Sequence, residues 1–511
     1  MTNIPRRIED LADELISAIL TFLLRPESSS NTSSPVNSNG LSSAHNGRQA
    51  HAYGEQSELG RFRLVCKRFC RISTPRKFRS FVLRFERRGF ERLEELVHMQ
   101  LACHVRRFTY MVRPFYKGSG NRWSELFAKI GPNDPSAVQI HKERLQCQRS
   151  FVTTDHDRAL LQKAIVAFSS LQQIKLLRLQ DEADEKLLDR IRERSLDETL
   201  ALDWEEACAR AVTNLGISLL ASNCTSVSFV GPQISPGATV RLLQTPSSTL
   251  SALGARLTCL DVNFHSKADL TSHMEVLSDV FQNFFLAATN LTSLHLGFAT
   301  ATPLDISLEQ VFHRIQWKRL STLSIQGWCL TSQEIIALIR RHRRQLRDIR
   351  LVEVYIRTGG RWRDVLSVLH DEMDEIEHID LRRINYTSYI DPASSVNGSN
   401  GHGNGHGHGH HNGNGSAAFH QPPSPLSIFV NSPSTPSPPP PFHQVVLNTD
   451  RLAFASRGQT RHSSNSPELE RLRRRTIDEL GDDGISVTLE QSRLWEKWVL
   501  SSPRRVTRRK H

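Results

Sequence analysis

A template of three apolar residues, spaced L-x-x-L-x-L, recurs five times between residues 257 and 381 and restricts the fold more than any other feature. Successive copies start 34, 29, 26 and 30 residues apart. The triplets are Leu257, Leu260, Val262; Leu291, Leu294, Leu296; Leu320, Leu323, Ile325; Leu346, Ile349, Leu351; and Ile376, Ile379, Leu381. Alternation of this kind suits a short strand that points two side chains into one core, and the spacing leaves room for one helix per repeat.

The segments between the templates have helical patterns. Thr331 and Glu334 form a capping box ahead of an apolar stripe. The stripes are Ile335, Leu338, Ile339; Met274, Leu277, Phe281, Phe284, Phe285; and Trp362, Val365, Leu366, Leu369. Weaker copies of the strand template are Leu171, Ile174, Leu176 and Cys224, Val227, Phe229. Because such short strands cannot bury a face alone, we expect an α/β strand-helix solenoid with one shared core, and an ordinary α/β sheet domain is the alternative.

Through this template, residues 92–390 resemble an irregular leucine-rich-repeat domain. The asparagine often found at the ninth position of that repeat is replaced by other residues, so we expect irregular turns. The replacements are His265, Ala299, Trp328, Val354 and Ile384. The resemblance implies an extended surface that binds another protein. Which residues contact that protein cannot be read from the sequence.

Two amphipathic helices are expected near the start of the chain. The first has apolar residues at steps of three and four, and Pro26 ends it. Its stripe is Ile8, Leu11, Ala12, Leu15, Ile16, Ile19 and Leu23. The second helix, Leu59 to Ile72, has the stripe Phe62, Val65, Cys66, Phe69, Ile72 and an outward face of Arg61, Lys67, Arg68 and Arg71. Thr74 and Pro75 suit the cap and first position of one more short helical turn.

The order of residue types across these helices resembles an F-box, a short all-α domain. The resemblance is carried by Leu11 to Leu20, by Leu64 to Phe69, and by Thr74-Pro75 leading to Phe78. It covers residues 1–25 plus 57–85 and implies docking onto the Skp adaptor of cullin-RING ubiquitin ligases. The implied adaptor-binding residues are Leu11, Leu15, Ile16, Ile19, Leu64, Val65 and Phe69. A helix pair that merely packs on the middle domain is the alternative.

Three segments lack the apolar residues that a packed core needs, so we expect them to be disordered or solvated. They are the Ser/Asn/Gly-rich insertion 26–56, the linker 392–441 with its Gly/His and Ser/Pro tracts, and the basic tail 501–511. Between the last two, residues 444–500 end in an amphipathic stretch with Trp495 and Trp498. We expect this segment to pack on the open end of the last repeat, and a separate partner-binding motif is the alternative.

The scattered cysteines indicate an intracellular protein. There are eight cysteines and no C-x-x-C pair, as is typical of free thiols in a reducing compartment. No signal-peptide core or apolar stretch of membrane-spanning length is present, so no membrane partner is expected. We expect a cytoplasmic protein, and the basic runs near the C-terminus leave nuclear entry open.

The net charge of +12 is concentrated in two places. Residues 58–92 contain 12 Lys/Arg against 3 Asp/Glu, and residues 446–511 contain 14 against 9. The presumed binding domain is otherwise close to neutral, so a nucleic-acid partner is not expected, although the basic tail keeps that third hypothesis open.

No catalytic or metal-binding motif stands out. The sequence lacks a G-x-S-x-G, an H-E-x-x-H, a P-loop and a Rossmann fingerprint. The histidines between His402 and His411 suit a low-complexity linker better than a metal site, and Cys66 with Cys70 lacks a second ligand pair. Asp482 and Asp483 between glycines indicate a turn. No enzyme and no cofactor is therefore expected.

These observations together predict a substrate-recognition adaptor of an SCF-type ubiquitin ligase. Its partners would be the Skp adaptor, cullin through that adaptor, and an unknown protein substrate. The alternative is a leucine-rich-repeat-like protein-binding scaffold that has no ligase association.

Overall fold

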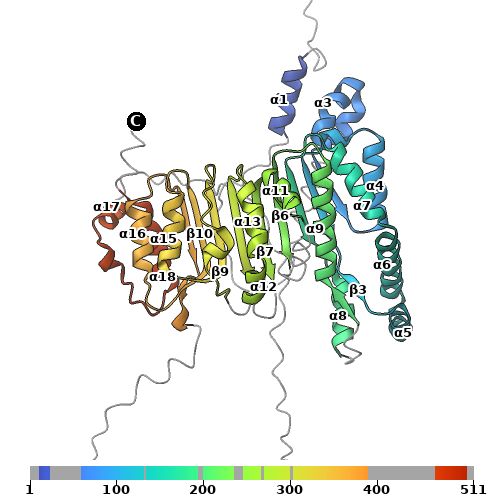
Figure 1. Ribbon diagram of the computed structural model, residues 1–511. Coiled ribbons are helices and arrows are strands. Elements are labelled where there is room, and N and C mark those ends of the chain that lie inside the picture. Colours follow the sequence, from blue (N-terminus) through green and yellow to red (C-terminus); the bar gives the residue numbers. More distant parts are fainter. Residues whose placement is uncertain are drawn as a thin grey trace, which may run out of the picture. The chain divides into compact units, whose positions relative to one another are not determined.

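The computed structural model describes residues 11–23, 59–131, 134–193, 200–234, 246–265, 270–299, 303–389 and 467–502 (Figure 1). The chain divides into a unit of residues 1–390 with 475–511 and a unit of residues 391–474. In the second unit the described element is helix α17, Pro467–Arg473. The expected disordered segments 26–56 and 392–441 lie outside the described residues, as does the tail beyond Ser502.

A ten-stranded parallel sheet organises the first unit, which makes the fold mixed α/β. Its strands follow one another in chain order, and the short β12 pairs with β10 beyond the end of β11. They are β1 (Ser80–Arg84), β2 (Arg107–Val112), β4 (Gln173–Arg178), β6 (Val227–Ile234), β7 (Leu257–His265), β8 (Ser293–Ala299), β9 (Thr322–Leu330), β10 (Asp348–Ile356), β11 (His378–Arg382) and β12 (Asn385–Tyr386). Sequential parallel pairing requires a crossover after each strand, and the helices supply it.

The predicted templates are in register across the sheet. Leu260 of β7 lies beside Leu294, and Leu294 beside Leu323. The row continues through Ile349 to Ile379. Since each of these side chains points to the same face, five repeats contribute equivalent residues to one apolar core.

The sheet extends further toward the N-terminus than the template predicts. The weaker copies form β4 and β6, where Ile174 lies beside Phe229. The sequence analysis missed β1 and β2, whose Phe81 and Phe108 continue the same apolar row. Residues 80–84 are thus part of the sheet and not of the helical head, which the sequence predicts at residues 57–85. The leucine template does not reveal these strands, because aromatic residues replace the leucines in them.

The helices between the strands form a layer on one side of the sheet, as Figure 1 shows for α9, α11, α13, α15 and α16. We call the opposite side, to which the alternate strand residues point, the polar face. The helices are α4 (Arg87–His98), α7 (His156–Ala167), α9 (Trp204–Ala221), α11 (Ser247–Ala255), α12 (Thr271–Val276), α13 (Ser278–Ala287), α14 (Leu308–Phe312), α15 (Ser332–Arg341) and α16 (Trp362–Asp371). A 3-10 turn, η2 (Ala102–His104), precedes β2.

Local capping fixes where several helices begin. The predicted box at Thr331 and Glu334 is confirmed, because each side chain bonds the other residue's backbone N–H. The stripe from Met274 to Phe285 does not form one helix, because the chain divides it into α12 and α13 at Leu277. Met274, Leu277, Phe281 and Phe285 nevertheless all reach the core.

Three neighbouring strands share a left-handed residue at the same register position. Gly327, Glu353 and Arg383 have φ values of 72°, 53° and 53°. Each residue adds one position to its strand, so the side chains three and five residues after the last template residue point inward again. These inward residues are Trp328 and Leu330, Val354 and Ile356, and Ile384 and Tyr386, and all are buried. Arg383 forms a 2.8 Å ion pair with Glu353, which joins two of the left-handed positions.

A second small core lies in the segment around β3 (Phe115–Lys117) and β5 (Ala201–Asp203), which pair antiparallel. Helices α5 (Gly120–Ile130), α6 (Pro135–Thr154) and α8 (Glu182–Glu193) surround it. Arg113 and Arg144 both pair with Asp184, which is almost fully buried, at 2.9 and 2.7 Å. The sequence analysis did not separate this lobe from the repeats, because its helical stripes resemble theirs.

The C-terminal segment covers the last strand. Helix α18 (Leu489–Leu500) packs on β11 and α16, and a 3-10 turn, η6 (Ile477–Leu480), precedes it. Glu496 accepts a 2.7 Å hydrogen bond from the backbone N–H of Leu381, at the edge of the sheet. The indole of Trp498 stacks on His370 at 4.0 Å. Ser501 and Ser502, expected in a solvated tail, are buried.

None of the described helices combines the length and the apolarity that a bilayer crossing requires.

Replacing Gly327 with alanine should destabilise the protein strongly. An added Cβ would lie 1.9 Å from the carbonyl oxygen of Phe298, on a backbone with φ of +72°. Steric overlap and left-handed strain together should lower the free energy of unfolding by about 3 kcal/mol or more, as measured by urea unfolding. Gly359→Ala is the control, because φ there is +91° but no atom lies within 4 Å, so only a loss of about 1–2 kcal/mol is expected. Equal losses would show that the contact with Phe298 is unimportant.

Candidate functional site

The N-terminal head is a small helical unit with its own core. It consists of helix α1 (Asp13–Leu23), a helical turn at residues 59–65 and helix α3 (Lys67–Lys77). Four buried side chains close the core: Ile16, Leu20, Leu59 and Phe69. The ring of Phe62 stacks on Phe69 with 4.4 Å between centroids. So small a core leaves most of the apolar surface of the helices outside it.

The helix predicted from Leu59 to Ile72 is broken at Cys66. Cys66 has an extended backbone and caps α3, because its Sγ accepts a hydrogen bond from the backbone N–H of Phe69. The extra turn predicted at Thr74-Pro75 is also wrong, because α3 continues through Pro75 to Lys77. The Thr74 hydroxyl donates back to the carbonyl of Cys70 at 2.6 Å and thus caps no helix.

Arginines of α3 hold the two helices together. Arg68 and Arg71 each form a 2.6 Å ion pair with Asp13, and their hydrogen bonds and charges lower the pKa of that carboxyl. Arg76 donates to the carbonyl and the hydroxyl of Ser17. Arg61, Lys67 and Arg71 of the predicted outward face are exposed, while Arg68 is half-buried beside Asp13.

The seven predicted adaptor-binding residues fall into two groups. Ile16 and Phe69 are buried in the head core, and Leu11 is half-buried against it. The other four are exposed: Leu15 by 53%, Ile19 by 40%, Leu64 by 86% and Val65 by 60%. We call these four exposed residues the apolar quartet.

The apolar quartet exists because α1 is apolar on more than one side. Ile16 and Leu20 point into the core, while Leu15 and Ile19, also four residues apart, form a second stripe. Leu64 and Val65 come just before the break at Cys66, which turns them away from the core-facing stripe. Large exposed aliphatic side chains of this kind can bind an apolar groove of a partner.

A polar cluster occupies the polar face of the sheet, and the sequence analysis missed it. Nδ1 of His295 lies 2.7 Å from the Ser324 hydroxyl, and its Nε2 lies 3.2 Å from Oδ1 of Asn263. Asp261 is the fourth member, 4.0 Å from His295 Nε2. The sequence contains a signal that could have predicted this cluster. Polar residues alternate with the apolar template residues in three successive strands.

Burial changes the protonation of this cluster. It lowers the pKa of His295 to about 4 and raises that of Asp261 to about 6. The charges of Lys175 and Arg350 only partly offset the effect on Asp261. Oδ1 of Asp261 has no hydrogen-bond partner. Neutral His295 therefore serves to hold side chains of three strands together, and Asp261 is a group that costs stability when it ionises.

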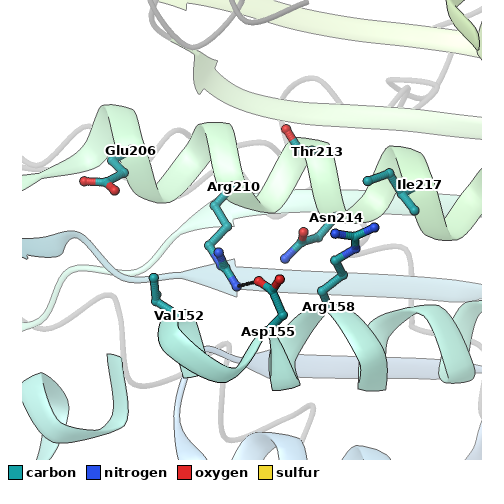
Figure 2. Close-up of a pocket in the computed structure, with 8 residues that line it drawn as sticks. All are labelled: Val152, Asp155, Arg158, Glu206, Arg210, Thr213, Asn214 and Ile217. Atoms are coloured by element: carbon teal, nitrogen blue, oxygen red, sulfur yellow. Dashed lines mark hydrogen bonds and ion pairs between the residues drawn. The ribbon is translucent and has the colours of Figure 1, made fainter. Parts of the chain in front are cut away.

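A pocket with a volume of about 200 Å³ lies between the α6–α7 junction and α9 (Figure 2). Its eight lining residues are Val152, Asp155, Arg158, Glu206, Arg210, Thr213, Asn214 and Ile217. Arg210 pairs with Asp155 and with buried Asp157 at 2.7 Å, and Asn214 donates to Asp157 at 3.0 Å. These partners raise the pKa of Arg210. The charge of Arg210 is therefore used to join the two helices, α7 and α9.

Within the described ranges no three His, Cys, Asp or Glu side chains lie close enough to hold a metal ion. The described cysteines, including Cys66 and Cys70, are free thiols. Asp482 occupies the predicted turn and accepts hydrogen bonds from Tyr386 and from the backbone N–H of Arg363, so it attaches the C-terminal segment. The histidine tract at 402–411 lies outside the described residues.

Comparison of the chain with protein-family models and with curated proteins found no match. Neither comparison identifies an F-box or a leucine-rich repeat, so both remain resemblances in residue pattern.

Replacing Asp261 with asparagine should stabilise the protein, and more so as the pH rises. The folded-state pKa of about 6 exceeds the ordinary aspartate pKa of 3.8, so the stability that Asp261 contributes at low pH is lost as the pH rises between these two values. The gain from the variant in free energy of unfolding should grow by about 1 kcal/mol between about pH 5 and about pH 7.5. Urea unfolding at both pH values measures it.

Asp374→Asn is the matched control, because Asp374 is exposed and forms no ion pair with any described residue. Removal of this exposed carboxylate should change the free energy of unfolding by less than about 0.5 kcal/mol. A gain for Asp261→Asn that is the same at both pH values would contradict the raised pKa.

Proposed function

We propose that this chain is the substrate-recognition adaptor of an SCF-type ubiquitin ligase. The F-box-like head docks on the Skp adaptor and through it on cullin, while the repeat-like α/β domain binds a target protein. The exposure of the apolar quartet is the observation that carries the proposal. A head that only packed on its own chain would bury Leu15 and Ile19, which are 53% and 40% exposed.

Helix α1 has one set of apolar side chains in the core of the head and another set that is exposed, which supports this proposal. Ile16 and Leu20 stabilise the head, so Leu15 and Ile19 are not needed for its core. Burying four aliphatic side chains in a partner's groove would contribute several kcal/mol of binding free energy, at about 1.5–3 kcal/mol for each fully buried side chain. Part of this gain is offset by the cost of association.

The repeating strands support the second half of the proposal. Buried apolar residues continue beyond the template at positions nine and eleven of β9 and β10, and those at position eleven extend the resemblance to leucine-rich repeats. They are Trp328 and Leu330 in β9 and Val354 and Ile356 in β10. Stacked strand-helix units present an extended surface, which such arrays use to bind proteins.

Such an adaptor requires no catalytic residues of its own. Its contribution is proximity, because it holds the target beside a ubiquitin-charged enzyme that belongs to the rest of the complex. The buried Ser324–His295 pair is compatible with this role, because both side chains lie within strands and neither lines the described pocket.

The alternative is a protein-binding scaffold without ligase association. The same sheet would bind the partner, and the head would serve another purpose. Adaptor binding separates the two functions.

The double variant Leu15→Asp with Ile19→Asp should lose association with a Skp adaptor. Two carboxylates would have to enter an apolar groove, which costs several kcal/mol, so retention of the adaptor should fall by at least about tenfold. Co-purification of co-expressed adaptor measures it. Because both side chains are exposed, the unfolding temperature should stay close to that of the wild-type chain.

Val276→Asp with Leu286→Asp is the matched control, because these side chains are 59% and 65% exposed on α12 and α13. This control should retain the adaptor. If the Leu15/Ile19 variant retains the adaptor as well as the wild-type chain does, or if the wild-type chain itself retains no adaptor, the ligase function is contradicted. The scaffold function would then be the one that stands.

A further inference from the structure

The polar face of β1, β2 and β4 has an unusual composition. Core residues such as Phe81, Phe108 and Ile174 point toward the helices, so the residues between them point to the polar face. The polar-face residues are Ser80, Val82, Arg84; Arg107, Thr109, Met111; and Gln173, Lys175, Leu177. Three of the nine are cations and none is an acid. We call Arg84, Arg107 and Lys175, with the apolar residues between them, the basic face.

No described acid lies within ion-pair distance of the cations of the basic face, although the charge of Lys175 acts on Asp261 from further away. Neither Arg84, Arg107 nor Lys175 forms an ion pair with a described residue, and Arg107 bonds only the Ser80 hydroxyl, at 3.0 Å. Arg79 adds a fourth positive charge beside Arg107. Partial burial and the repulsion from Arg79 lower the pKa of Arg107. Charges of one sign placed together in this way cost stability unless an anion neutralises them.

Strand register places these cations within reach of one short ligand. Arg107 pairs in register with both Ser80 and Gln173. With strands about 4.8 Å apart and about 3.3 Å per residue, the Cα atoms of Arg107 and Lys175 lie roughly 8 Å apart, and those of Arg84 and Lys175 roughly 12 Å. An extended peptide of about four residues covers that span.

Apolar side chains occupy the space between the charges. Val82 is 40% exposed, and the half-buried Met111 and Leu177 lie side by side in the next outward-pointing row, where Met111 is also beside Arg84. The surface therefore suits a peptide that carries apolar side chains as well as acids. A ligand with negative charge alone would leave this apolar surface uncovered.

The remainder of the polar face differs in both charge and access. Arg350 and Arg382 pair with Asp348 and Asp380 on their own strands, at 2.9 and 2.8 Å. Asp261 and His295 are buried. On the described part of the polar face, accessible positive charge without an ion pair is thus concentrated on the first strands of the sheet.

We propose that the basic face binds an acidic, extended segment of the target protein, in which carboxylates alternate with apolar or small side chains. The carboxylates pair with Arg84, Arg107 and Lys175, and an apolar side chain covers Val82. This inference rests on the proposed function in one respect, because it assumes that the sheet binds a protein target.

Fluorescence anisotropy with the full-length chain tests the proposal. The probe is a labelled peptide of about twelve residues in which glutamate alternates with valine and serine, and the same peptide with glutamine in place of glutamate is the comparison. The glutamate peptide should bind more tightly. Changing Arg84, Arg107 and Lys175 together to glutamate should weaken its binding by about tenfold or more, because attraction becomes repulsion.

The matched control changes three exposed cations elsewhere to glutamate: Lys318, Arg343 and Arg344. This control changes the net charge as much as the Arg84/Arg107/Lys175 variant does. It should change the affinity for the glutamate peptide by less than about twofold. An equal loss in the control would overturn the proposal, because it would show unspecific attraction by net charge. Equal binding of the glutamine peptide, or tighter binding of single-stranded RNA of similar length, would overturn it as well.

Adaptor co-purification separates this proposal from the proposed function. The Arg84/Arg107/Lys175 variant should still retain the Skp adaptor, because the apolar quartet is unchanged, and loss of the adaptor together with the peptide would mean that the variant is misfolded. If the wild-type chain binds the acidic peptide but no adaptor, the ligase function fails while the basic face stands.

Discussion

The in-register apolar row that crosses the parallel sheet is the constraint on which the rest of the structure depends. It runs from Phe81 and Phe108 through Ile174 and Phe229 to Leu260, Leu294, Leu323, Ile349 and Ile379. No single strand of five to nine residues can bury such a side chain alone, so every strand depends on its neighbours. A shift of one residue in any strand would move its apolar side chains to the polar face, and the register is therefore strongly specified.

The same row explains the left-handed residues in β9, β10 and after β11. Alternation would send Trp328, Val354 and Ile384 away from the helices, and one additional residue in each strand returns them to the core. Because the additional residues are at equivalent positions, the strands stay in register on both sides of them. The strain at Glu353 and Arg383 is partly offset by their ion pair, while at the first of the three positions a glycine avoids the strain.

The apolar quartet and the basic face lie on different parts of this chain. The apolar quartet lies on the head, whose core is closed without it. The basic face lies on the first strands of the sheet, whereas the last strand is covered by α18 through Glu496 and Trp498. The proposed adaptor function requires two such surfaces, one for the ligase and one for the target, and the apolar quartet and the basic face differ in chemistry.

The sequence by itself determined the strands from β7 to β11, the capping box at Thr331 and the apolar residues of the head, because these depend on local spacing and on the chemistry of side chains. It did not determine which of the head residues are buried. Ile16 and Leu15 are neighbours of similar hydrophobicity, and only contact with Leu59 and Phe69 buries one and leaves the other exposed. The basic face also needed the tertiary structure, because Arg84, Arg107 and Lys175 are far apart in sequence and meet only when parallel strands align. Burial and strand pairing are properties of the whole chain, and local patterns carry no information about which partner a residue meets.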